Sequence, residues 1–215
     1  MKIPVSITSV ASVSALGSRP QEIWEAYLDP KHFLQKHRLG ENRFFAASLP
    51  AVLKKEIDIL CTENSNYPHL DDSVMYAIKA AREAVEAAGW EKGRDIGINF
   101  GSSRGATGLF EKYHQQFLEE AKAETLASPG TTLGNISSWV AQDLESTGPE
   151  ISHSVTCSTG LHAVLNGVAW LNSGMVEKFL AGGSEAALTP FTVAQVQAMK
   201  IAAREELKYP CQALN

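Results

Sequence analysis

The sequence predicts an α/β fold in which a mixed, mainly parallel sheet is flanked by helices. Stretches rich in β-branched residues alternate with stretches of helical periodicity, which is the pattern of successive βαβ units. Residues 71–89 have the capping residues and the small apolar face of a helix that packs closely on a sheet. Residues 157–174 follow a strand directly and are apolar almost all round, which indicates a buried helix. Together these features indicate layers of helix and sheet.

The amino-terminal part of the chain contains fewer regular patterns. Ile3–Val10 has the composition of a strand and leads into a turn at Ser14–Gly17. A helix is expected to begin at Pro20, because the apolar residues that follow it recur at helical spacing. Prolines and a glycine interrupt residues 30–70, so we expect loops there with one short helix near Ala51–Leu60.

The central part predicts the best-defined elements. Asp71 and Asp72 can cap the free amide groups at a helix start, and Gly89 can end that helix. Beyond it, strands and helices alternate, and glycine-rich turns follow some of the strands. The expected elements are a strand at Asp95–Phe100, a turn at Gly101–Gly105, helices at Leu109–Lys122 and Asn135–Leu144, a strand at Ile151–Thr156, a helix at Cys157–Gly174, a strand at Val176–Ala181 and a turn at Gly182–Glu185.

Composition and charge exclude several classes of partner. With 44% hydrophobic and 20% charged residues, the 215-residue chain has the composition of a globular protein. Its net charge is −5 and its basic residues are scattered, so the sequence contains no cluster of positive charge that could bind a phosphate backbone. We therefore expect no nucleic-acid partner. No apolar run reaches the roughly 20 residues that span a bilayer, and the start of the chain lacks the apolar region of a secretory signal. We therefore expect a cytoplasmic protein without a membrane partner.

Cys157 is the strongest candidate for a catalytic residue. The other cysteines, Cys61 and Cys211, lie far from it in sequence, and none of the three forms a metal or redox pair motif. A thiol must ionise to act as a nucleophile, and the amide groups and positive dipole end at a helix start favour the thiolate. The same amides can stabilise an oxyanion, and the small residues Ser158, Thr159 and Gly160 leave room for an extended acyl thioester.

Four segments of the chain resemble, in the same order, segments of the β-ketoacyl synthase family. They are the opening segment Ile7–Gly17, the helix segment Ala80–Gly89, the nucleophile segment Ser154–Ala163 and the turn Leu180–Ala186. The resemblance implies a thiolase-like fold, which in the complete enzyme stacks two similar halves in five layers. Residues 1–215 are then expected to form the amino-terminal domain. The charged final stretch has no recognisable cap, which indicates a chain cut off before its carboxy-terminal half.

The resemblance also implies a reaction. Cys157 accepts an acyl group from the phosphopantetheine of an acyl carrier protein and condenses it with a malonyl unit as carbon dioxide leaves, with no other cofactor and no metal. In the family two histidines and a lysine of the second half complete the site. Here they would lie beyond Asn215, so this stretch alone is expected to be inactive. The alternatives are a non-catalytic ketosynthase-like partner of the chain-length-factor type and a thiolase, which condenses without decarboxylation.

The resemblance extends to the partner subunit and the substrate contacts. It implies a homodimer, or a heterodimer with a ketosynthase-like subunit, through the strand Ile151–Thr156. Ser158 and Thr156 are expected to contact substrate, and the family usually has Ala or Gly where Thr156 stands. Arg104 occupies a turn that lines the acyl pocket in the family, where an apolar residue is more usual. A buried Arg104 would need a partner and would favour an oxygenated or polyene chain, whereas the alternative has it pointing to solvent.

The histidines nearest to Cys157 in sequence do not match the family's catalytic positions. We expect His153 and His162 to be core or subunit-contact residues, and a thiol–histidine pair is the alternative. An α/β-hydrolase elbow is excluded, because it would require glycine where Val155 and Thr159 stand.

Overall fold

The computed structural model describes residues 4–39, 41–93, 95–133, 135–203 and 207–211. Its strands form a three-stranded main sheet and a separate two-stranded hairpin. The elements, in chain order, are α1 (Pro20–Leu28), β1 (Gln35–Leu39), β2 (Asn42–Ala46), α2 (Ala51–Leu60), the short 3-10 helix η1 (Tyr67–His69), α3 (Asp72–Ala87), β3 (Ile96–Gly101), α4 (Thr107–Glu120), α5 (Ala127–Thr131), α6 (Asn135–Asp143), β4 (Glu150–His153), α7 (Thr159–Asn172), β5 (Lys178–Gly183) and α8 (Pro190–Ala198).

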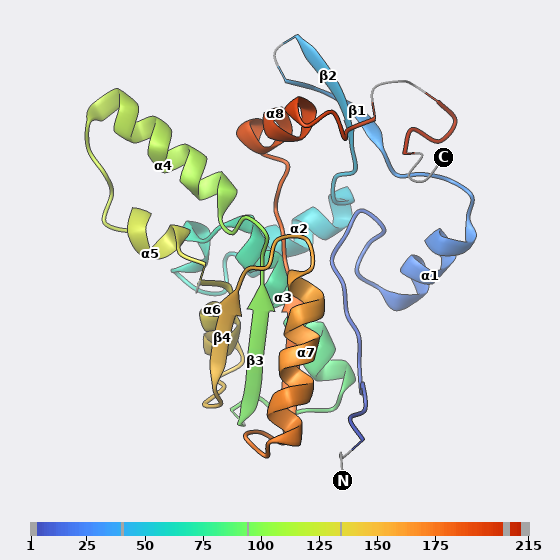
Figure 1. Cartoon of the computed structure of the whole chain (residues 1–215), viewed down its shortest axis with the longest axis vertical. Helices are drawn as coiled ribbons and strands as arrows, with labels where there is room; N and C mark the ends of the chain where they lie inside the picture. The colour runs from blue at the N-terminus through green and yellow to red at the C-terminus, as the bar shows by residue number, and fades with distance from the viewer. Residues whose placement is uncertain (1–3, 40, 94, 134, 204–206, 212–215) are drawn as a thin grey trace.

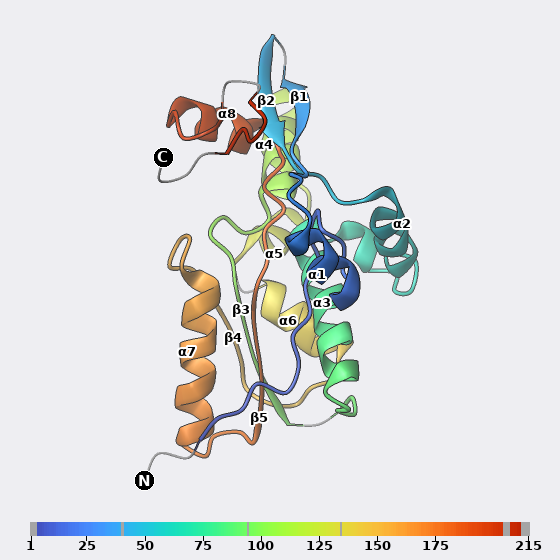
Figure 2. The same ribbon diagram turned by 90° about the vertical axis from the view of Figure 1, so that its right-hand side faces the viewer.

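The main sheet has the strand order β4-β3-β5, and all of its strands run parallel. Asn99 in the central strand β3 pairs with Ile151 of β4 on one side and with Ala181 of β5 on the other. Helix α7 lies on one face of this sheet, and α3 and α6 lie on the other (Figures 1 and 2). The predicted α/β fold is confirmed, with a main sheet that is wholly parallel over the part the structure describes.

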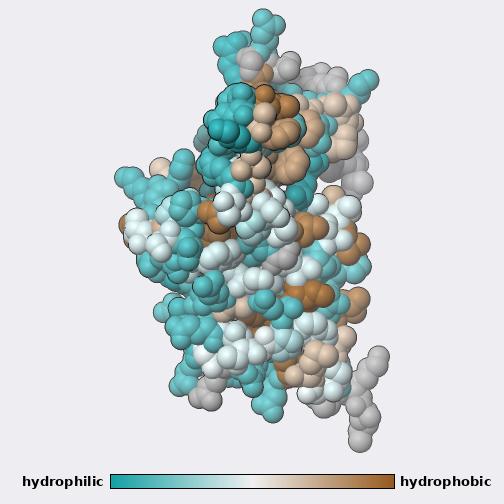
Figure 3. Space-filling model, turned by 90° about the vertical axis from the view of Figure 1, so that its left-hand side faces the viewer, coloured by the Kyte–Doolittle hydropathy of each residue, from teal (hydrophilic) through white to brown (hydrophobic). Residues whose placement is uncertain are grey.

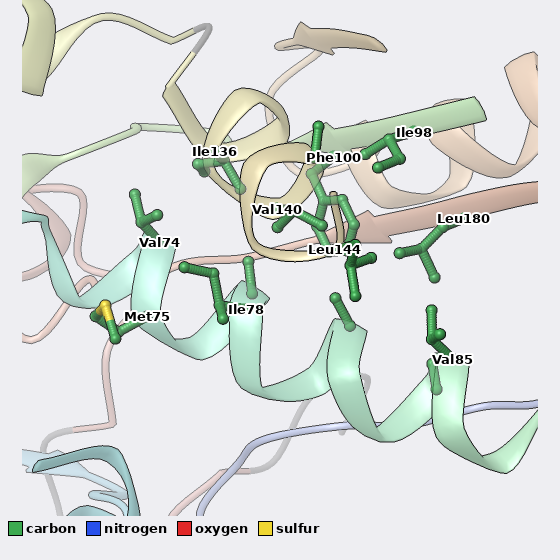
Figure 4. Close-up of a cluster of buried hydrophobic side chains, with 14 of the residues drawn as sticks. Val74, Met75, Ile78, Val85, Ile98, Phe100, Ile136, Val140, Leu144 and Leu180 are labelled. Carbon is green, nitrogen blue, oxygen red and sulfur yellow. The ribbon is translucent and has the colours of Figure 1, made fainter. Parts of the chain in front are cut away.

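The hydrophobic core lies between β3 and the helices α3 and α6. Every residue of β3 is buried, as expected for a parallel strand that is covered on both faces. In Figure 4 the core side chains of both helices point toward each other and toward the sheet. They are Val74, Met75, Ile78 and Val85 of α3, Ile136 and Val140 of α6, Leu144 directly after it, Ile98 and Phe100 of β3, and Leu180 of β5. Each such burial stabilises the fold by roughly 1.5–3 kcal/mol, so the core fixes β3 and the turn that follows it.

Asp71 joins the starts of two helices. Its Oδ1 accepts hydrogen bonds from the amide of Ser73 at 2.9 Å and from the hydroxyl of Ser73 at 2.6 Å, which caps α3. Its Oδ2 accepts a bond of 3.2 Å from the amide of Leu109 in the first turn of α4. Gly89, with φ +65°, follows the end of α3. The predicted cap and stop are confirmed, and Asp71 also ties α4 to α3.

The first predicted strand, Ile3–Val10, is wrong over its described part, which starts at Pro4. Residues 4–13 belong to no strand, although the turn at Ser14–Gly17 forms with two backbone hydrogen bonds of 3.0 and 3.1 Å. In Figure 2 the segment passes beside β5, and a cavity of about 720 Å³ is lined by both. A β-branched composition favours extended backbone, but a strand also needs a hydrogen-bonded neighbour, which this segment lacks in the described structure.

The region between residues 30 and 70 contains an unpredicted hairpin. Helix α2 forms where the sequence predicted it, over Ala51–Leu60. Before it, β1 and β2 pair antiparallel, with Gln35 opposite Ala46. The sequence of β1, QKHRL, is polar and has no apolar alternation, so periodicity gave no signal for a strand.

Helix α7 is not buried as the sequence predicted. Its inner face, with Ala163 and Gly167, is buried against the sheet, but Leu161 and Leu165 on its outer face are 77% and 62% exposed. Hydrophobic side chains lie along the edge of the molecule that α7 forms in Figure 3. A helix on one sheet has one covered side, and no described element lies over the other. Within the described ranges, no helix is long and apolar enough to cross a membrane.

Candidate active site at the carboxyl end of the sheet

The turns that follow the three parallel strands meet at the carboxyl end of the main sheet. This is the end at which open α/β sheets bind their ligands. The β3 turn is formed by residues 102–105, the β4 turn by residues 154–158 and the β5 turn by residues 184–185. The amide of Ser184 donates to the carbonyl of Gly101 at 3.0 Å, which joins the ends of β3 and β5.

Cys157 lies in the β4 turn, directly before Ser158, which is the N-cap residue of α7. The sequence predicted that Cys157 lies in the first turn of the helix. The structure places Cys157 just before that turn, because β4 ends at His153 and α7 begins at Thr159. The side chain is exposed and belongs to no disulfide. The thiol is therefore open to solvent beside the positive end of a helix dipole.

The backbone directly before the thiol is strained. Thr156 has φ +52°, in the left-handed region that β-branched residues rarely occupy. Such a conformation costs about 1–3 kcal/mol and persists only where surrounding contacts hold it. Three hydrogen bonds reach the carbonyl of Thr156: from Ser103 Oγ at 2.9 Å, from Thr159 Oγ1 at 2.5 Å and from the amide of Thr159 at 3.2 Å. They fix the turn on which Cys157 lies.

Thr159 is the local clamp of this turn. Its hydroxyl donates to the carbonyl of Thr156 and accepts a hydrogen bond of 2.9 Å from the amide of Val155. The residue is 3% exposed. Its buried side chain thus connects Val155 and Thr156, in the first half of the turn, to the start of α7.

Two glycines allow α7 to approach the sheet closely. A Cβ at Gly101 would lie 1.9 Å from Cγ2 of Thr159, so only glycine fits there. A Cβ at Gly183 would lie 3.3 Å from Cα of Gly160, in the first turn of α7. The Gly-Gly turn noted in the sequence therefore lies directly behind the segment that carries Cys157.

Glu185 connects the β5 turn to the β3 turn. Its Oε1 accepts hydrogen bonds from the hydroxyl of Ser102 at 3.0 Å and from the amide of Ser103. The same Ser102 oxygen accepts a bond of 2.8 Å from the amide of Gly105, which closes the β3 turn. A single carboxylate oxygen thus organises the loop whose Ser103 holds Thr156.

Arg104 is exposed, which decides between the two positions that the sequence left open. Its Nη1 donates to Oε1 of Gln195 on α8. The guanidinium is therefore at the surface in the described structure, and it still has a defined partner. Because Arg104 follows Ser103 in the β3 turn, its charge lies in the loop that contacts the turn carrying Cys157.

Three further polar residues near the turn form hydrogen bonds with groups other than Cys157. The hydroxyl of Ser158 donates to the carbonyl of Val155 at 3.0 Å. Nδ1 of His162 lies 3.1 Å from the carbonyl oxygen of Ser158, and Nδ1 of His153 lies 3.0 Å from Nδ2 of Asn99. Each of these contacts uses Nδ1, and Nε2 of His153 is buried without a hydrogen-bond partner among the described residues. No hydrogen bond between either ring and the Cys157 thiol is present among the described residues, so the structure gives no support for a thiol–histidine pair.

Comparison with solved structures defines the fold class. The chain is similar to one chain of a solved complex described as "type II PKS acyl-carrier protein in complex with its ketosynthase bound to the hexaketide", with a TM-score of 0.77, 20% identity, and coverage of 95% of this chain and 50% of that chain. It is also similar to the ishigamide ketosynthase/chain length factor, with a TM-score of 0.72, 18% identity, and coverage of 90% and 50%. The structure is therefore a thiolase-like α/β fold, as predicted.

Comparison of sequences defines the family. Residues 2–214 match the family described as "Beta-ketoacyl synthase, N-terminal domain". The chain belongs to the β-ketoacyl synthase family. It is 27% identical over 206 residues to 3-oxoacyl-[acyl-carrier-protein] synthase 2 of Coxiella burnetii, covering 91% of this chain and 49% of that protein, and 25% identical over 205 residues to the enzyme of the same name from Vibrio harveyi, covering 91% and 49%. The chain thus spans about half the length of the curated relatives it matches.

The sequence indicated Cys157 as a candidate catalytic residue but did not indicate the residues that hold its turn. Ser103 and Glu185 are polar residues in loops, and neither is part of a motif with a defined chemistry. The only local signal was the glycine content of the two turns, which indicates close backbone approach. From the sequence, Thr159 was interpreted as a small residue beside the thiol and as a departure from the hydrolase elbow, not as a residue that holds the turn.

Proposed function

We propose that the protein is a β-ketoacyl synthase that uses Cys157 as its acyl acceptor in fatty acid or polyketide biosynthesis. The single observation that carries this proposal is the position of the thiol. Cys157 is exposed, lies on a strained turn at the carboxyl end of a parallel sheet, and directly precedes the N-cap residue of α7. Family membership supplies the class of reaction, and the turn supplies a reactive group that an acyl thioester can reach.

The proposed chemistry has two steps. In the first, the sulfur of Cys157 attacks the thioester carbonyl of an acyl carrier protein, a new carbon–sulfur bond forms, and the phosphopantetheine thiol leaves. In the second, a malonyl thioester loses carbon dioxide, and the resulting enolate attacks the acyl carbonyl and displaces Cys157 as a thiolate. Amide groups at the start of α7 stabilise the oxyanion of each step. The acyl groups arrive on phosphopantetheine, so this scheme needs no other cofactor.

We propose that residues 1–215 alone do not catalyse the second step. Decarboxylation requires groups that stabilise the enolate, and among the described residues neither His153 nor His162 forms a hydrogen bond with Cys157. The outer face of α7, with the exposed Leu161 and Leu165, is proposed to be covered in the longer protein, since the chain spans about half of its relatives. An apolar face of this kind is costly to leave in water.

We also propose two protein partners. One is an acyl carrier protein, because the exposed thiol is open to a tethered arm. The other is a second ketosynthase-like subunit, either a copy or a close relative, bound through β4. This strand pairs only with β3 in the described sheet, and its Ile151 is 43% exposed. An open strand edge with an apolar side chain favours addition of another strand.

Carbon dioxide release tests the proposed reaction. The native-length gene product is incubated with acyl carrier protein that carries an acyl group and with malonyl carrier protein labelled in its free carboxyl group. We expect labelled carbon dioxide to be released together with a β-ketoacyl product, and Cys157→Ala to abolish formation of that product. A thiolase would condense two acyl thioesters without release. A native-length protein that forms no product while Cys157 is intact would instead be assigned to the non-catalytic partner class.

A further inference from the structure

The three hydrogen bonds to the Thr156 carbonyl come from two different parts of the chain. Two of them, from the hydroxyl and the amide of Thr159, are formed within the turn itself. The third comes from the hydroxyl of Ser103, which is 53 residues away in the β3 turn. Ser103 is therefore the residue that fixes the strained carbonyl relative to the sheet.

Ser103 is in turn held by the β5 turn. Its amide donates to Oε1 of Glu185, and the same oxygen accepts the hydroxyl of the buried Ser102 at 3.0 Å. Its carbonyl lies 3.5 Å from the hydroxyl of Ser154 in the β4 turn. Backbone and side chain of one residue thus connect the turns after β3, β4 and β5.

This geometry decides the direction of the Cys157 side chain. The peptide unit between Thr156 and Cys157 contains the carbonyl that Ser103 holds, so a rotation of that carbonyl also rotates the amide and the Cα of Cys157. The left-handed conformation of Thr156 is intrinsically unfavourable, so the turn will relax where a contact is lost. Loss of the Ser103 hydroxyl leaves only the local bonds from Thr159 to oppose that relaxation.

We propose that Ser103 and Glu185 are positioning residues, which orient the Cys157 thiol by holding the carbonyl of Thr156. This inference rests on the proposed function in so far as it concerns acyl transfer. Neither residue touches the reacting atoms: Ser103 acts on the nucleophile turn, and Glu185 acts through Ser103.

The test compares Ser103→Ala with Ser103→Thr, which restores a hydroxyl, in the native-length protein. Acylation of Cys157 by an acyl carrier protein is followed in single-turnover experiments over a range of donor concentrations. We expect Ser103→Ala to lower the limiting rate about tenfold, because a net hydrogen bond of this kind is worth about one power of ten, while the half-saturating concentration stays unchanged. Ser103→Thr should recover most of that rate. Glu185→Gln, which keeps an acceptor oxygen, should lose less than Glu185→Ala.

Ser138→Ala is the matched control. Ser138 is an exposed serine on α6 whose hydroxyl donates to Oε1 of Glu150 at 2.9 Å, at the other end of β4. Ser138→Ala likewise removes one hydrogen bond donated by a serine hydroxyl, here to a carboxylate instead of a backbone carbonyl, and it leaves the turns after β3, β4 and β5 untouched. We expect its acylation rate to equal that of the unmodified protein. A loss with Ser138→Ala equal to that with Ser103→Ala would overturn the proposal.

A second readout does not depend on acylation. Hydrogen exchange at the amide of Thr159, which donates to the Thr156 carbonyl, should become faster in Ser103→Ala and stay unchanged in Ser138→Ala. If the unmodified protein is not acylated, the proposed function fails, but this measurement still decides the positioning role. Unchanged exchange at Thr159 in Ser103→Ala would contradict that role even in a fully active protein.

Discussion

Gly101 lies directly against Thr159, so that a Cβ at Gly101 would be 1.9 Å from Cγ2 of the threonine. The central strand β3 and the helix α7 therefore approach each other more closely than any side chain larger than hydrogen at Gly101 allows. The position of Cys157 depends on this contact, because Thr159 also clamps the turn that carries the thiol.

Gly101→Ala should destabilise the protein by about 1–3 kcal/mol, because the new methyl group displaces the start of α7. Urea unfolding followed by circular dichroism measures the effect. In the Gly101→Ala background, Thr159→Ser removes the clashing Cγ2 and should recover part of the loss. Gly160→Ala is the control, since a Cβ there meets no atom within 4 Å. Equal losses for Gly101→Ala and Gly160→Ala would contradict the close approach.

Thr156→Gly should be more stable than Thr156→Ala. The residue has φ +52°, and a Cβ in that region costs about 1–2 kcal/mol, part of which is offset by the greater freedom of glycine in the unfolded chain. We therefore expect a difference of about 0.5–1 kcal/mol in the free energy of unfolding. A glycine variant less stable than the alanine variant would show that the turn is not strained.

Asp143 should make stability depend on pH in the acid range. Burial alone raises the pKa of this carboxyl, but hydrogen bonds from Arg82, with Nε to Oδ2 at 2.8 Å, and from Tyr67, with Oη to Oδ1 at 2.6 Å, outweigh burial and hold the pKa below its ordinary value. A lowered folded-state pKa contributes stability that is present above the unfolded value of about 3.9 and is lost as the pH falls through the folded value.

Asp143→Asn should therefore cost about 1.5–3 kcal/mol at pH 7, because it removes charge-assisted hydrogen bonds. The difference in unfolding free energy between Asp143→Asn and the unmodified protein should shrink as the pH falls from about 5 toward 3. Urea unfolding at a series of pH values measures this difference. A difference that stays constant from neutral to acid pH would rule out the linkage.

Arg104 should influence acyl chain preference. The guanidinium is exposed, so the preference does not follow from burial of its charge. Gln195 accepts from one of its five N–H donors, and the other donors can form hydrogen bonds with an oxygenated chain in the turn region. Arg104→Leu should shift the ratio of acylation rates toward saturated over hydroxylated acyl donors by about tenfold. Arg19→Leu, an exposed change on the amino-terminal side of α1, is the control. The same ratio in Arg104→Leu and Arg19→Leu would exclude Arg104 from substrate selection.

Sequence patterns predicted the elements whose signals are local. The α3 helix follows from Asp71 at its cap and from its apolar face, and both act within a few residues. Strand β3 follows from Ile96, Ile98 and Phe100, which alternate with smaller or polar residues before a glycine-rich turn. The burial of α7 was predicted wrongly because periodicity indicates which side chains avoid water, not whether a second layer is present to cover them. The prediction of a strand at Ile3–Val10 was wrong over the described residues for a related reason, since a strand depends on a hydrogen-bonded neighbouring strand.

The candidate site was predictable only in part. Cys157 follows a strand and precedes an apolar helix, so its position is local in sequence. The contacts that hold its turn are not local: Ser103 reaches Thr156 across 53 residues, and Glu185 reaches Ser103 across 82. No spacing rule connects such loops, because only the parallel sheet brings their ends together.

Mass spectrometry of the acyl adduct, first on the intact protein and then on its peptides, tests the role of Cys157 most directly. The native-length gene product is incubated with an acyl carrier protein that carries the acyl group, digested and mapped. We expect one acyl group per chain, attached to Cys157, and no adduct in Cys157→Ala, whereas Cys61→Ala and Cys211→Ala should be acylated normally. An acyl group on another residue, or an unmodified Cys157 after complete incubation, would contradict the assignment of Cys157 as the acyl acceptor.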